Sequence, residues 1–381
     1  MYERPAGIEN SRIWIDGCFD FAHHGHAGAM LQARQIGREL FVGVHSDEEI
    51  LHNKGPVVMH LDERLAAVAA CKWVTQAVPD APYVTAPWFM DKYGCQYVVH
   101  GDDITTDANG EDCYQEMKDL GRFVVVKRTP NISTTDLVGR MLLMSKAHHF
   151  QPIKESLTGH PLFSKQEYLD RFKTYASDAT GLRPGSGVYV HLGGKQESLH
   201  ELVAPSDATK KLYDTIFYID GTFDVFHPGH IEALRLVKER AAASGAAVVV
   251  GLYDDWVTNH TKGLNYPIMN LLERSLCVLQ CRFVDGVVLG APSSATPDFF
   301  TLFPGKVAHV FSGPAQKPAA EPLHPAVEAI SVPIGPHKYD NINTAFIVNR
   351  VLDNRAAYEE RQRRKGWKAQ HEAQLKDQNA S

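Results

Sequence analysis

Short apolar runs and longer amphipathic stretches alternate along the first 150 residues of the chain. The apolar runs are rich in β-branched and aromatic residues, which is typical of buried strands. We therefore expect strands at Ile13–Asp16, Leu40–Val44, Trp73–Val78, Tyr97–His100 and Phe123–Val126, with helices between them. Strands that alternate with helices predict a parallel, doubly wound α/β sheet, whose ligands bind at the carboxyl ends of the strands.

The second half of the chain repeats the pattern of the first. After an apolar strand, both Asp16–His26 and Asp220–His230 carry a Gly turn, a Phe-Asp step and a His-x-Gly-His motif. Further steps recur in the same order, namely Lys54-Gly55 with Lys262-Gly263, Glu63-Arg64 with Glu273-Arg274, and Cys71–Val74 with Cys281–Val284. One long internal period indicates a duplicated domain and not a solenoid of short repeats. We predict a first domain over residues 11–150 and a second over residues 212–352.

The segments outside these two domains look different. Residues 151–211 contain many Gly and Pro breakers, so we expect a partly ordered linker with one amphipathic helix over Ser164–Tyr175. Residues 353–381 are mostly polar and predict a solvated C-terminal helix or tail. Its apolar side chains are too few for a membrane-binding face: Tyr358, Trp367 and Leu375.

The composition is that of an ordinary globular protein, with 44% hydrophobic and 22% charged residues in 381. The formal net charge of −6 argues against a general nucleic-acid-binding protein, which carries a basic face. Neither a signal peptide nor an integral membrane segment is predicted, because no apolar run is long enough. The six cysteines are scattered without a CxxC pair, so we expect thiols in a reducing, cytoplasmic setting.

The His-x-Gly-His motif lies where a strand gives way to a helix. Helix N-termini have unpaired N–H groups and the positive end of the helix dipole, so they suit phosphate groups. His23 and His26 therefore form a candidate anion clamp, and Gly25, which has no Cβ, leaves room for a phosphate between them. One short motif is also compatible with a structural surface turn, but its second copy at His227–His230 favours a phosphate-binding role.

Three further groups suit a charged ligand. Lys54 follows the second predicted strand beside a Gly-Pro turn, and its recurrence as Lys262 favours phosphate contact over a surface lysine with no specific role. The hydroxyls of Ser133–Thr135 can cap the helix that follows, while Arg128 adds a cation ahead of it. Capping and anion binding are compatible uses of this loop. His100–Asp103 ends the fourth predicted strand, where carboxylates suit an amino group, a ribose or a metal.

Together these motifs resemble the cytidylyltransferases of the His-x-Gly-His nucleotidylyltransferase superfamily, and among them the duplicated members that act on ethanolamine phosphate. The likeness covers residues 13–150 and 216–352, and it is carried by Gly17–His26, Lys54–Pro56, Trp73-Val74, Ala81–Val84, His100–Ile104 and Arg128–Leu142. It implies two tandem Rossmann-like nucleotidyltransferase domains. The family signature Arg-Thr-x-Gly-Ile-Ser-Thr-Thr has Asn131 in place of its glycine, and because Asn tolerates a positive φ we expect the turn to survive.

The resemblance implies transfer of CMP from CTP to phosphoethanolamine, giving CDP-ethanolamine and pyrophosphate for phospholipid biosynthesis. A phosphate monoester is already an anionic nucleophile, so positioning and positive donors matter more than a general base. The implied contacts along CTP are His23 and His26 at the transferred and leaving phosphates, Lys54 at the α-phosphate, and Arg128, Ser133 and Thr134 at the β/γ end. The other implied nucleotide-binding positions are Gly17, Cys18, Phe19, Gly25, His100, Asp102 and Thr129. Mg²⁺ enters with CTP, and no metal site built from protein ligands is expected.

The choice of acceptor follows in part from chemistry. A choline site favours an aromatic cage, whereas a primary ammonium also needs hydrogen-bond acceptors. The choline relatives carry an aromatic residue after the Asp-Asp-Ile step, where this chain has Thr105 and Thr106, which favours ethanolamine phosphate. Asp20 and Trp73 are the candidate acidic and aromatic walls of the acceptor site.

The second half departs from the pattern. Lys338–Ala345 replaces Arg128–Thr135, and the acidic Asp340 in this loop would repel a phosphate. The clamp itself persists, and the candidate nucleotide-binding residues are Gly221, Thr222, Phe223, His227, Gly229, His230, Lys262, Asn343 and Thr344. We predict that the second domain binds a nucleotide and turns over poorly or not at all.

Two other interpretations stay open at this point. One is a different nucleotidylyltransferase that uses ATP or an acceptor such as glycerol phosphate. The other is a nucleotide-sensing scaffold, against which the intact Lys54, Arg128 and histidines of the first half argue. A homodimer and an intramolecular pseudo-dimer of the two domains are both compatible with the sequence.

Overall fold

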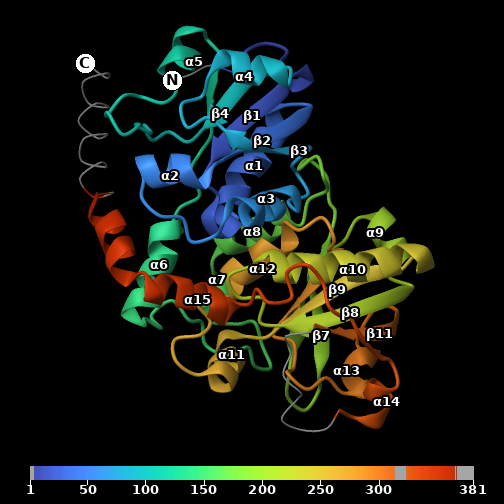
Figure 1. The fold of residues 1–381 in the computed structure, drawn as a ribbon. Coiled ribbons are helices and arrows are strands. Elements are labelled where there is room, and N and C mark those ends of the chain that lie inside the picture. Colours follow the sequence, from blue (N-terminus) through green and yellow to red (C-terminus); the bar gives the residue numbers. More distant parts are fainter. Residues whose placement is uncertain (1–3, 314–322, 365, 367–381) are drawn as a thin grey trace. The chain divides into compact units, whose positions relative to one another are not determined.

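The computed structural model describes residues 4–313, 323–364 and 366 (Figure 1). The chain divides into two units, which differ from the predicted boundaries. Unit 1 comprises Met1–Leu142 and Ile347–Ser381, and unit 2 comprises Leu143–Phe346. The C-terminal residues therefore belong with the first half of the sequence, a grouping that no local pattern in the sequence predicts.

Unit 1 contains the predicted parallel sheet. Within the described residues it has the order β3-β2-β1-β4-β5, and all of its paired strands are parallel. The strands are β1 (Arg12–Gly17), β2 (Glu39–His45), β3 (Gln76–Ala81), β4 (Cys95–His100) and β5 (Phe123–Val125). All expected strands are confirmed, with β3 starting three residues later because Cys71–Val74 forms a turn, closed by a bond from Val74 N to Cys71 O. The strand order reverses between β1 and β4, and sheets of this kind bind ligands beyond the carboxyl ends of the strands at such a point.

The helices of unit 1 connect these strands. They are α1 (His24–Ile36), α2 (Asp47–Asn53), α3 (Leu61–Ala69), α4 (Pro87–Lys92), α5 (Gln115–Asp119) and α6 (Thr134–Leu143), with short 3₁₀ turns at Ile8–Asn10 and Asp20–Ala22. Trp14 on β1 is buried and lies edge-on to Phe89 and stacked on Tyr93, at ring separations of 5.6 and 5.8 Å. Apolar burial of this kind anchors the sheet on which the site is built.

Unit 2 repeats the sheet and extends it. Its described residues form a sheet of order β12-β11-β8-β9-β10-β6-β7. Read from β10 to β12, the first five of these strands have the same order as β3-β2-β1-β4-β5 in unit 1. The strands are β6 (Gly187–Leu192), β7 (Ser198–Val203), β8 (Thr215–Gly221), β9 (Ala247–Leu252), β10 (Gly286–Leu289), β11 (Lys306–Ser312) and β12 (Ser331–Pro333). β6 is parallel to β10, and β7 is antiparallel to β6. The duplicated α/β fold is confirmed.

The predicted linker is an ordered part of unit 2. It contributes β6 and β7, and the helix expected over Ser164–Tyr175 is divided into α7 (Pro161–Ser164) and α8 (Gln166–Tyr175). The remaining helices of unit 2 are α9 (Asp207–Leu212), α10 (Pro228–Ser244), α11 (Asp255–Lys262), α12 (Leu271–Leu279), α13 (Pro297–Thr301) and α14 (Pro325–Glu328). Val188 and Val190 on β6 are fully buried and their neighbours on the strand are buried as well, so burial on both faces makes this segment a strand despite the glycines that flank it.

The last described helices lead back to unit 1. α15 (Thr344–Asp353) is followed by helical residues 355–364. Tyr358 in this stretch is buried, with 3% of its surface exposed, while most of its neighbours are exposed. The predicted solvated helix is thus anchored through the buried Tyr358 and the partly buried Arg361, and residues 365 and 367–381 of the predicted tail lie outside the described residues. No helix in the described part of the chain has the length and apolarity needed to cross a membrane.

Candidate active site

The first His-x-Gly-His motif caps α1 at the carboxyl end of β1. The Nδ1 atom of His23 accepts hydrogen bonds from the backbone N–H groups of Gly25 and His26, at 3.1 and 3.4 Å. The rings of His23 and His26 stack with centroids 3.8 Å apart. Because Nδ1 accepts, the neutral His23 ring carries its proton on Nε2, which makes Nε2 a donor for an anion. The predicted strand, turn, clamp and helix are all present.

Gly25 is required by packing as well as by the expected ligand. A Cβ at this position would lie 2.6 Å from Cγ2 of Ile132 and 2.9 Å from the ring of His23. In unit 2 a Cβ on Gly229 would lie 2.4 Å from the carbonyl oxygen of Ile342. Each glycine therefore lets the loop before the last helix approach the clamp, which brings the two predicted anion-binding segments of each half together.

The loop between β1 and α1 is held in a strained backbone conformation. Phe19, Phe21 and Ala22 have positive φ values of 56°, 64° and 37°. In unit 2 the equivalent Phe223 also has a positive φ, 50°, and Val225 has 48°. Such conformations persist only where surrounding contacts enforce them, and they cluster at functional sites. The Phe19 ring lies edge-on to His26 at 5.4 Å, so the strained turn also positions the clamp.

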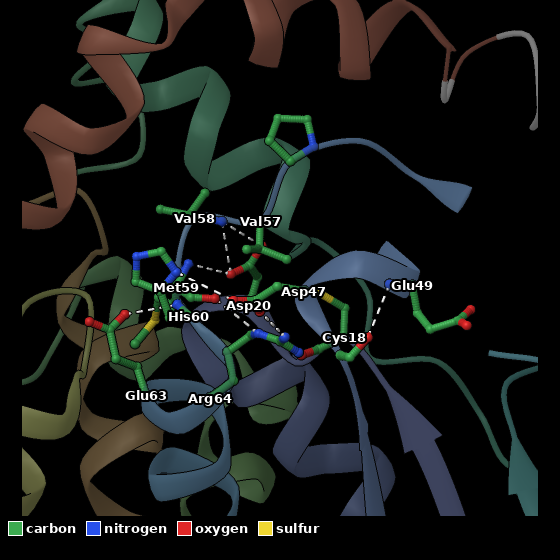
Figure 2. A network of polar contacts seen from close by, with 12 residues as sticks. Cys18, Asp20, Asp47, Glu49, Val57, Val58, Met59, His60, Glu63 and Arg64 are labelled. Carbon is green, nitrogen blue, oxygen red and sulfur yellow. Dashed lines mark hydrogen bonds and ion pairs between the residues drawn. The ribbon is translucent and has the colours of Figure 1, made fainter. Parts of the chain in front are cut away.

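Asp20 fixes the loop that follows Lys54 (Figure 2). Its buried carboxylate accepts hydrogen bonds from the N–H groups of Val58, at 3.1 and 3.2 Å, and Met59, at 2.9 Å. In unit 2 Asp224 accepts from Ile268 and Met269 in the same way, at 2.7 and 2.9 Å. These bonds tie the His-x-Gly-His loop to the lysine loop in both halves, and an acceptor-binding role for Asp20 stays a prediction.

A buried arginine completes this network. Arg64 is fully buried and donates to the carbonyls of Met59 and Cys18, at 2.9 and 2.7 Å, and to the carboxylate of Asp47 at 2.6 Å. Figure 2 shows its guanidinium group between these segments. The planar fork of an arginine suits several acceptors that diverge in one plane. Arg64 aligns with Arg274 in the sequence, but the sequence assigns neither a role, since the acceptors of Arg64 lie on three separate segments and two of them are backbone carbonyls.

Lys54 lies just after α2 and faces the carboxyl edge of the sheet. Its Nζ lies 5.4 Å from the centre of the Tyr83 ring. Burial lowers the pKa of His45 and of His100, and the positive charge of Lys54 lowers both further. His45 ends β2 and His100 ends β4, so the structure places Lys54 at the strand ends where the sequence predicted a ligand.

A buried carboxylate at the end of β1 was missed by the sequence analysis. Asp16 accepts hydrogen bonds from Trp14 Nε1 at 2.8 Å, from Thr85 Oγ1 at 2.5 Å and from the Tyr114 hydroxyl at 2.7 Å. Burial raises the pKa of Tyr114 well above its ordinary value, and Asp16 raises it further. The hydroxyl therefore stays protonated and donates. Burial lowers the pKa of His100, while the negative charges of Asp103 and Asp16 act in the opposite direction, so this edge carries carboxylates as well as the cation of Lys54.

The loop before α6 has the predicted turn and cap. Asn131 has a φ of 65°, as expected for the residue that replaces the family glycine. Ser133 Oγ accepts from the N–H of Asp136 at 3.1 Å and donates to its carboxylate at 2.7 Å, so it caps α6. Arg128 is more than half exposed and pairs with Asp103 at 3.1 Å. Their contacts with a nucleotide stay predictions.

The remaining predicted positions of the first half are spread over the same unit. Gly17 ends β1, Asp102 is exposed after β4, and Thr129 and Thr134 are half-buried in the loop before α6 and at its start. Trp73 is 1% exposed and lies in the turn after α3, with Lys72 Nζ 5.3 Å from its ring. Its burial places Trp73 in the core of the unit, and its predicted contact with the acceptor stays a prediction.

The second clamp is more deeply buried than the first. The rings of His227 and His230 stack 3.7 Å apart. Burial, then the charges of Lys262 and His337, lower the pKa of His227 to about 3. Burial also lowers the pKa of Lys262. Lys262 and His337 thus both lie within electrostatic reach of the His227 ring.

The loop that departs from the family pattern is closed on itself. The carboxylate of Asp340 accepts from the N–H of His337 at 3.4 Å, and Lys338 Nζ donates to the Tyr339 hydroxyl at 2.9 Å. Asn343 caps α15 by accepting from the N–H of Phe346 at 3.0 Å, as Ser133 caps α6. Thr344 Oγ1 donates to the carbonyl of Asp224 at 2.9 Å, so this hydroxyl has a structural role in unit 2.

Comparisons with known proteins agree with this arrangement. A family model described as cytidylyltransferase-like matches residues 14–140 and 218–311. An ethanolamine-phosphate cytidylyltransferase of Mus musculus is 39% identical to this chain, and the match covers 93% of this chain and 89% of the relative. One of Dictyostelium discoideum is 40% identical, and the match covers 93% of this chain and 94% of the relative. A choline-phosphate cytidylyltransferase A of Mus musculus is 33% identical over 46% of this chain and 50% of its own length. The likeness to the ethanolamine-phosphate relatives thus spans both halves.

Proposed function

Since the chain belongs to the ethanolamine-phosphate cytidylyltransferase family, we propose that it transfers CMP from CTP to phosphoethanolamine. The observation that carries the proposal is the stacked pair of His23 and His26 at the N-terminus of α1, beside the carboxyl end of the central strand β1. Backbone N–H groups, a helix dipole and two imidazoles converge there, and Lys54 faces the same edge. These groups are donors without a strong base, which suits phosphoryl chemistry more than proton abstraction.

In the proposed reaction a phosphate oxygen of phosphoethanolamine attacks the α-phosphorus of CTP. The new P–O bond forms as the bond to the β-phosphate oxygen breaks, and its electrons leave with pyrophosphate. His23 and His26 hold the transferred and leaving phosphates, and Lys54 holds the α-phosphate. Arg128, with Ser133 and Thr134, receives the β/γ end. Preorganised donors lower the barrier because they meet charge that builds up in the transition state.

Mg²⁺ enters this proposal with CTP. When bound, the ion neutralises charge on the triphosphate oxygens. Among the described residues no three His, Cys, Asp or Glu side chains gather as a metal site.

Further proposals concern the choice of acceptor, the cellular location and the assembly. Thr105 and Thr106 in place of an aromatic residue support ethanolamine phosphate over choline phosphate. Asp20 and Trp73 are kept as proposed acceptor walls. The scattered cysteines support a cytoplasmic setting. Homodimer and intramolecular pseudo-dimer remain alternative proposals for the assembly.

For unit 2 we propose nucleotide binding with little or no turnover. The buried cluster of His227, His230 and Lys262 supports binding of an anion. Asp340 adds a negative charge to the loop that in unit 1 carries Arg128. A cation persists as Lys338, but the negative charge of Asp340 offsets it and would weaken stabilisation of the leaving pyrophosphate.

The test uses the full chain with CTP, Mg²⁺ and phosphoethanolamine. His23→Ala and His26→Ala are each expected to lower kcat by roughly 10²- to 10³-fold, as for loss of one preorganised donor. His52→Ala, an exposed histidine on α2, is the matched control and is expected to leave kcat unchanged. A loss below about threefold in a folded clamp variant would remove the clamp from the mechanism. Substantial residual turnover that disappears on adding His227→Ala would show that unit 2 is catalytic.

A further inference from the structure

The segment that follows α15 belongs to the unit that holds Lys54. Residues 347–364 are part of unit 1, whereas residues 143–346 form unit 2. Figure 1 shows the red helical residues after α15 beside α6, and Gln362 Nε2 donates to the carbonyl of Thr135 at 3.4 Å. The described residues after α15 therefore pack in the unit that contains the first candidate site.

This C-terminal segment holds the loop directly after Lys54. Three consecutive carbonyls of the loop each accept a hydrogen bond from it: Pro56 from Arg361 Nη1 at 2.6 Å, Val57 from the Tyr358 hydroxyl at 2.8 Å, and Val58 from Arg350 Nη1 at 3.2 Å. Arg350 also forms a bidentate ion pair with Glu63, at 2.6 and 2.7 Å. Because the N–H groups of Val58 and Met59 donate to Asp20, both edges of the loop are fixed.

The contacts are built into the interior of unit 1. The Arg361 side chain is 16% exposed, and its Nη1 lies 3.4 Å from the buried carboxylate of Asp20. Gly55 has a φ of 101°, and a Cβ there would lie 3.3 Å from Cβ and Cγ of Arg361, so the glycine lets the helix approach. Burial, and next the charge of Asp20, raise the pKa of Tyr358 to about 12, so its hydroxyl donates at physiological pH.

In unit 2 the loop after Lys262 is held at the carbonyl that is equivalent to that of Val57. Pro267 aligns with Val57, and its carbonyl lies 2.9 Å from His148 Nε2 and 2.8 Å from His149 Nε2. His148 follows α6 in the sequence, and Tyr358 follows α15. The lysine loop of unit 1 is thus held by the segment after α15, the last helix of the second half, and that of unit 2 by the segment after α6, the last helix of the first half. Two occurrences of the same arrangement with different side chains argue against incidental packing.

We infer that residues 350–361 form a clasp that positions Lys54 for the first active site, with Arg350, Tyr358 and Arg361 as positioning residues. The inference rests on the phosphate-contacting role of Lys54 in the proposed function. Lys54 immediately precedes Gly55, so release of the loop at Pro56 lets the ammonium group move. A displacement of about 1 Å can cost on the order of 10²-fold in rate. Turnover in the first half thus depends on a segment that follows the second half in the sequence.

The test compares full-length variants on one helix. Arg361→Met keeps the aliphatic stem and removes the guanidinium, and Tyr358→Phe removes one hydroxyl and leaves the buried ring in place. Arg355→Met is the matched control, because Arg355 is exposed and pairs with Glu359 on the same helix. We expect kcat to fall on the order of 10-fold for Arg361→Met and about threefold for Tyr358→Phe, with a smaller change in KM for CTP. Arg355→Met is expected to match the unmodified protein.

Two further measurements separate positioning from general stability. In a Lys54→Ala background, Arg361→Met is expected to lower kcat by less than about twofold, because there is no ammonium group left to position. Amide exchange of Val58 and Met59 is expected to be faster in Arg361→Met and unchanged in Arg355→Met. Arg361→Lys is expected to restore part of the rate.

The outcomes are distinguishable. If Lys54→Ala lowers kcat but Arg361→Met and Tyr358→Phe both behave like Arg355→Met, the clasp is refuted and the proposed function stands. An undiminished effect of Arg361→Met in the Lys54→Ala background also refutes the clasp. If Lys54→Ala itself leaves kcat unchanged, the proposed role of Lys54 is wrong, and the clasp fails with it.

Discussion

Replacing Arg64 by lysine tests the network that joins the two loops of the first site. Arg64 is fully buried and bonds to the carbonyls of Met59 and Cys18 and to Asp47. Arg64→Lys keeps the charge and most of the aliphatic stem. It replaces a planar fork of donors by one compact ammonium group, which cannot reach acceptors on three separate segments at once.

The expected cost follows from the acceptors left unpaired. A buried carbonyl that loses its donor costs about 1–3 kcal/mol. With one or two acceptors unpaired, we expect Arg64→Lys to lower the free energy of unfolding of unit 1 by roughly 2–4 kcal/mol. Because Met59 also donates to Asp20, the lysine loop should loosen and kcat should fall with stability.

Urea unfolding followed by tryptophan fluorescence measures this effect, since the buried Trp14 and Trp73 both lie in unit 1. The matched variant is Arg274→Lys, because Arg274 is equally buried and bonds to Met269, Thr222, Tyr253 and Asp255 in unit 2. It should destabilise unit 2 by a similar amount and reduce turnover less. An unfolding free energy for Arg64→Lys within about 0.5 kcal/mol of the unmodified protein would refute the reasoning.

Two other predictions follow from the same structure. Gly25→Ala should lower the free energy of unfolding by about 1–3 kcal/mol, because the new Cβ would lie 2.6 Å from Ile132. Gly139→Ala on α6, with open space around it, should be neutral or stabilising. Thermal unfolding compares the two variants, and equal stability of both would contradict the close approach at Gly25. His227 has a folded-state pKa of about 3 against an ordinary 6.5, so the unfolded chain binds more protons than the folded one between these pH values. The free energy of unfolding therefore decreases as pH falls, by about 2 kcal/mol for one such residue between about pH 7 and pH 5. Urea unfolding at both pH values should show a weaker acid dependence for His227→Asn, and an unchanged dependence would contradict a neutral buried ring.

The sequence predicted what depends on local pattern. The five strands of unit 1, the helix after each clamp and the left-handed Asn131 follow from apolar runs, glycine turns and residue-specific backbone preferences. The Ser133 cap followed from its place before an amphipathic stretch. Each of these depends on residues within a few positions of one another, where periodicity and capping chemistry are informative.

What the sequence could not predict depends on contacts between distant residues. β6 and β7 lie in a segment whose glycines suggested a linker, yet pairing of β6 with β10 makes them part of the unit 2 sheet. The Tyr358 hydroxyl meets the Val57 carbonyl across most of the chain, and nothing in a polar tail indicates that partner. The hydrogen-bonding role of Asp16 was not predicted, because its three donors come from separate elements. Backbone carbonyls leave no trace in a sequence, so the networks built on them are visible only in the fold.

Pyrophosphate release by the full chain with CTP and Mg²⁺ directly tests the transfer of CMP to phosphoethanolamine. The acceptors to compare are phosphoethanolamine, phosphocholine and glycerol 3-phosphate, with ATP replacing CTP in a parallel series. We expect rapid release with CTP and phosphoethanolamine, and little with the other acceptors or with ATP. Release with none of the acceptors, or a preference for phosphocholine, glycerol 3-phosphate or ATP, would contradict it.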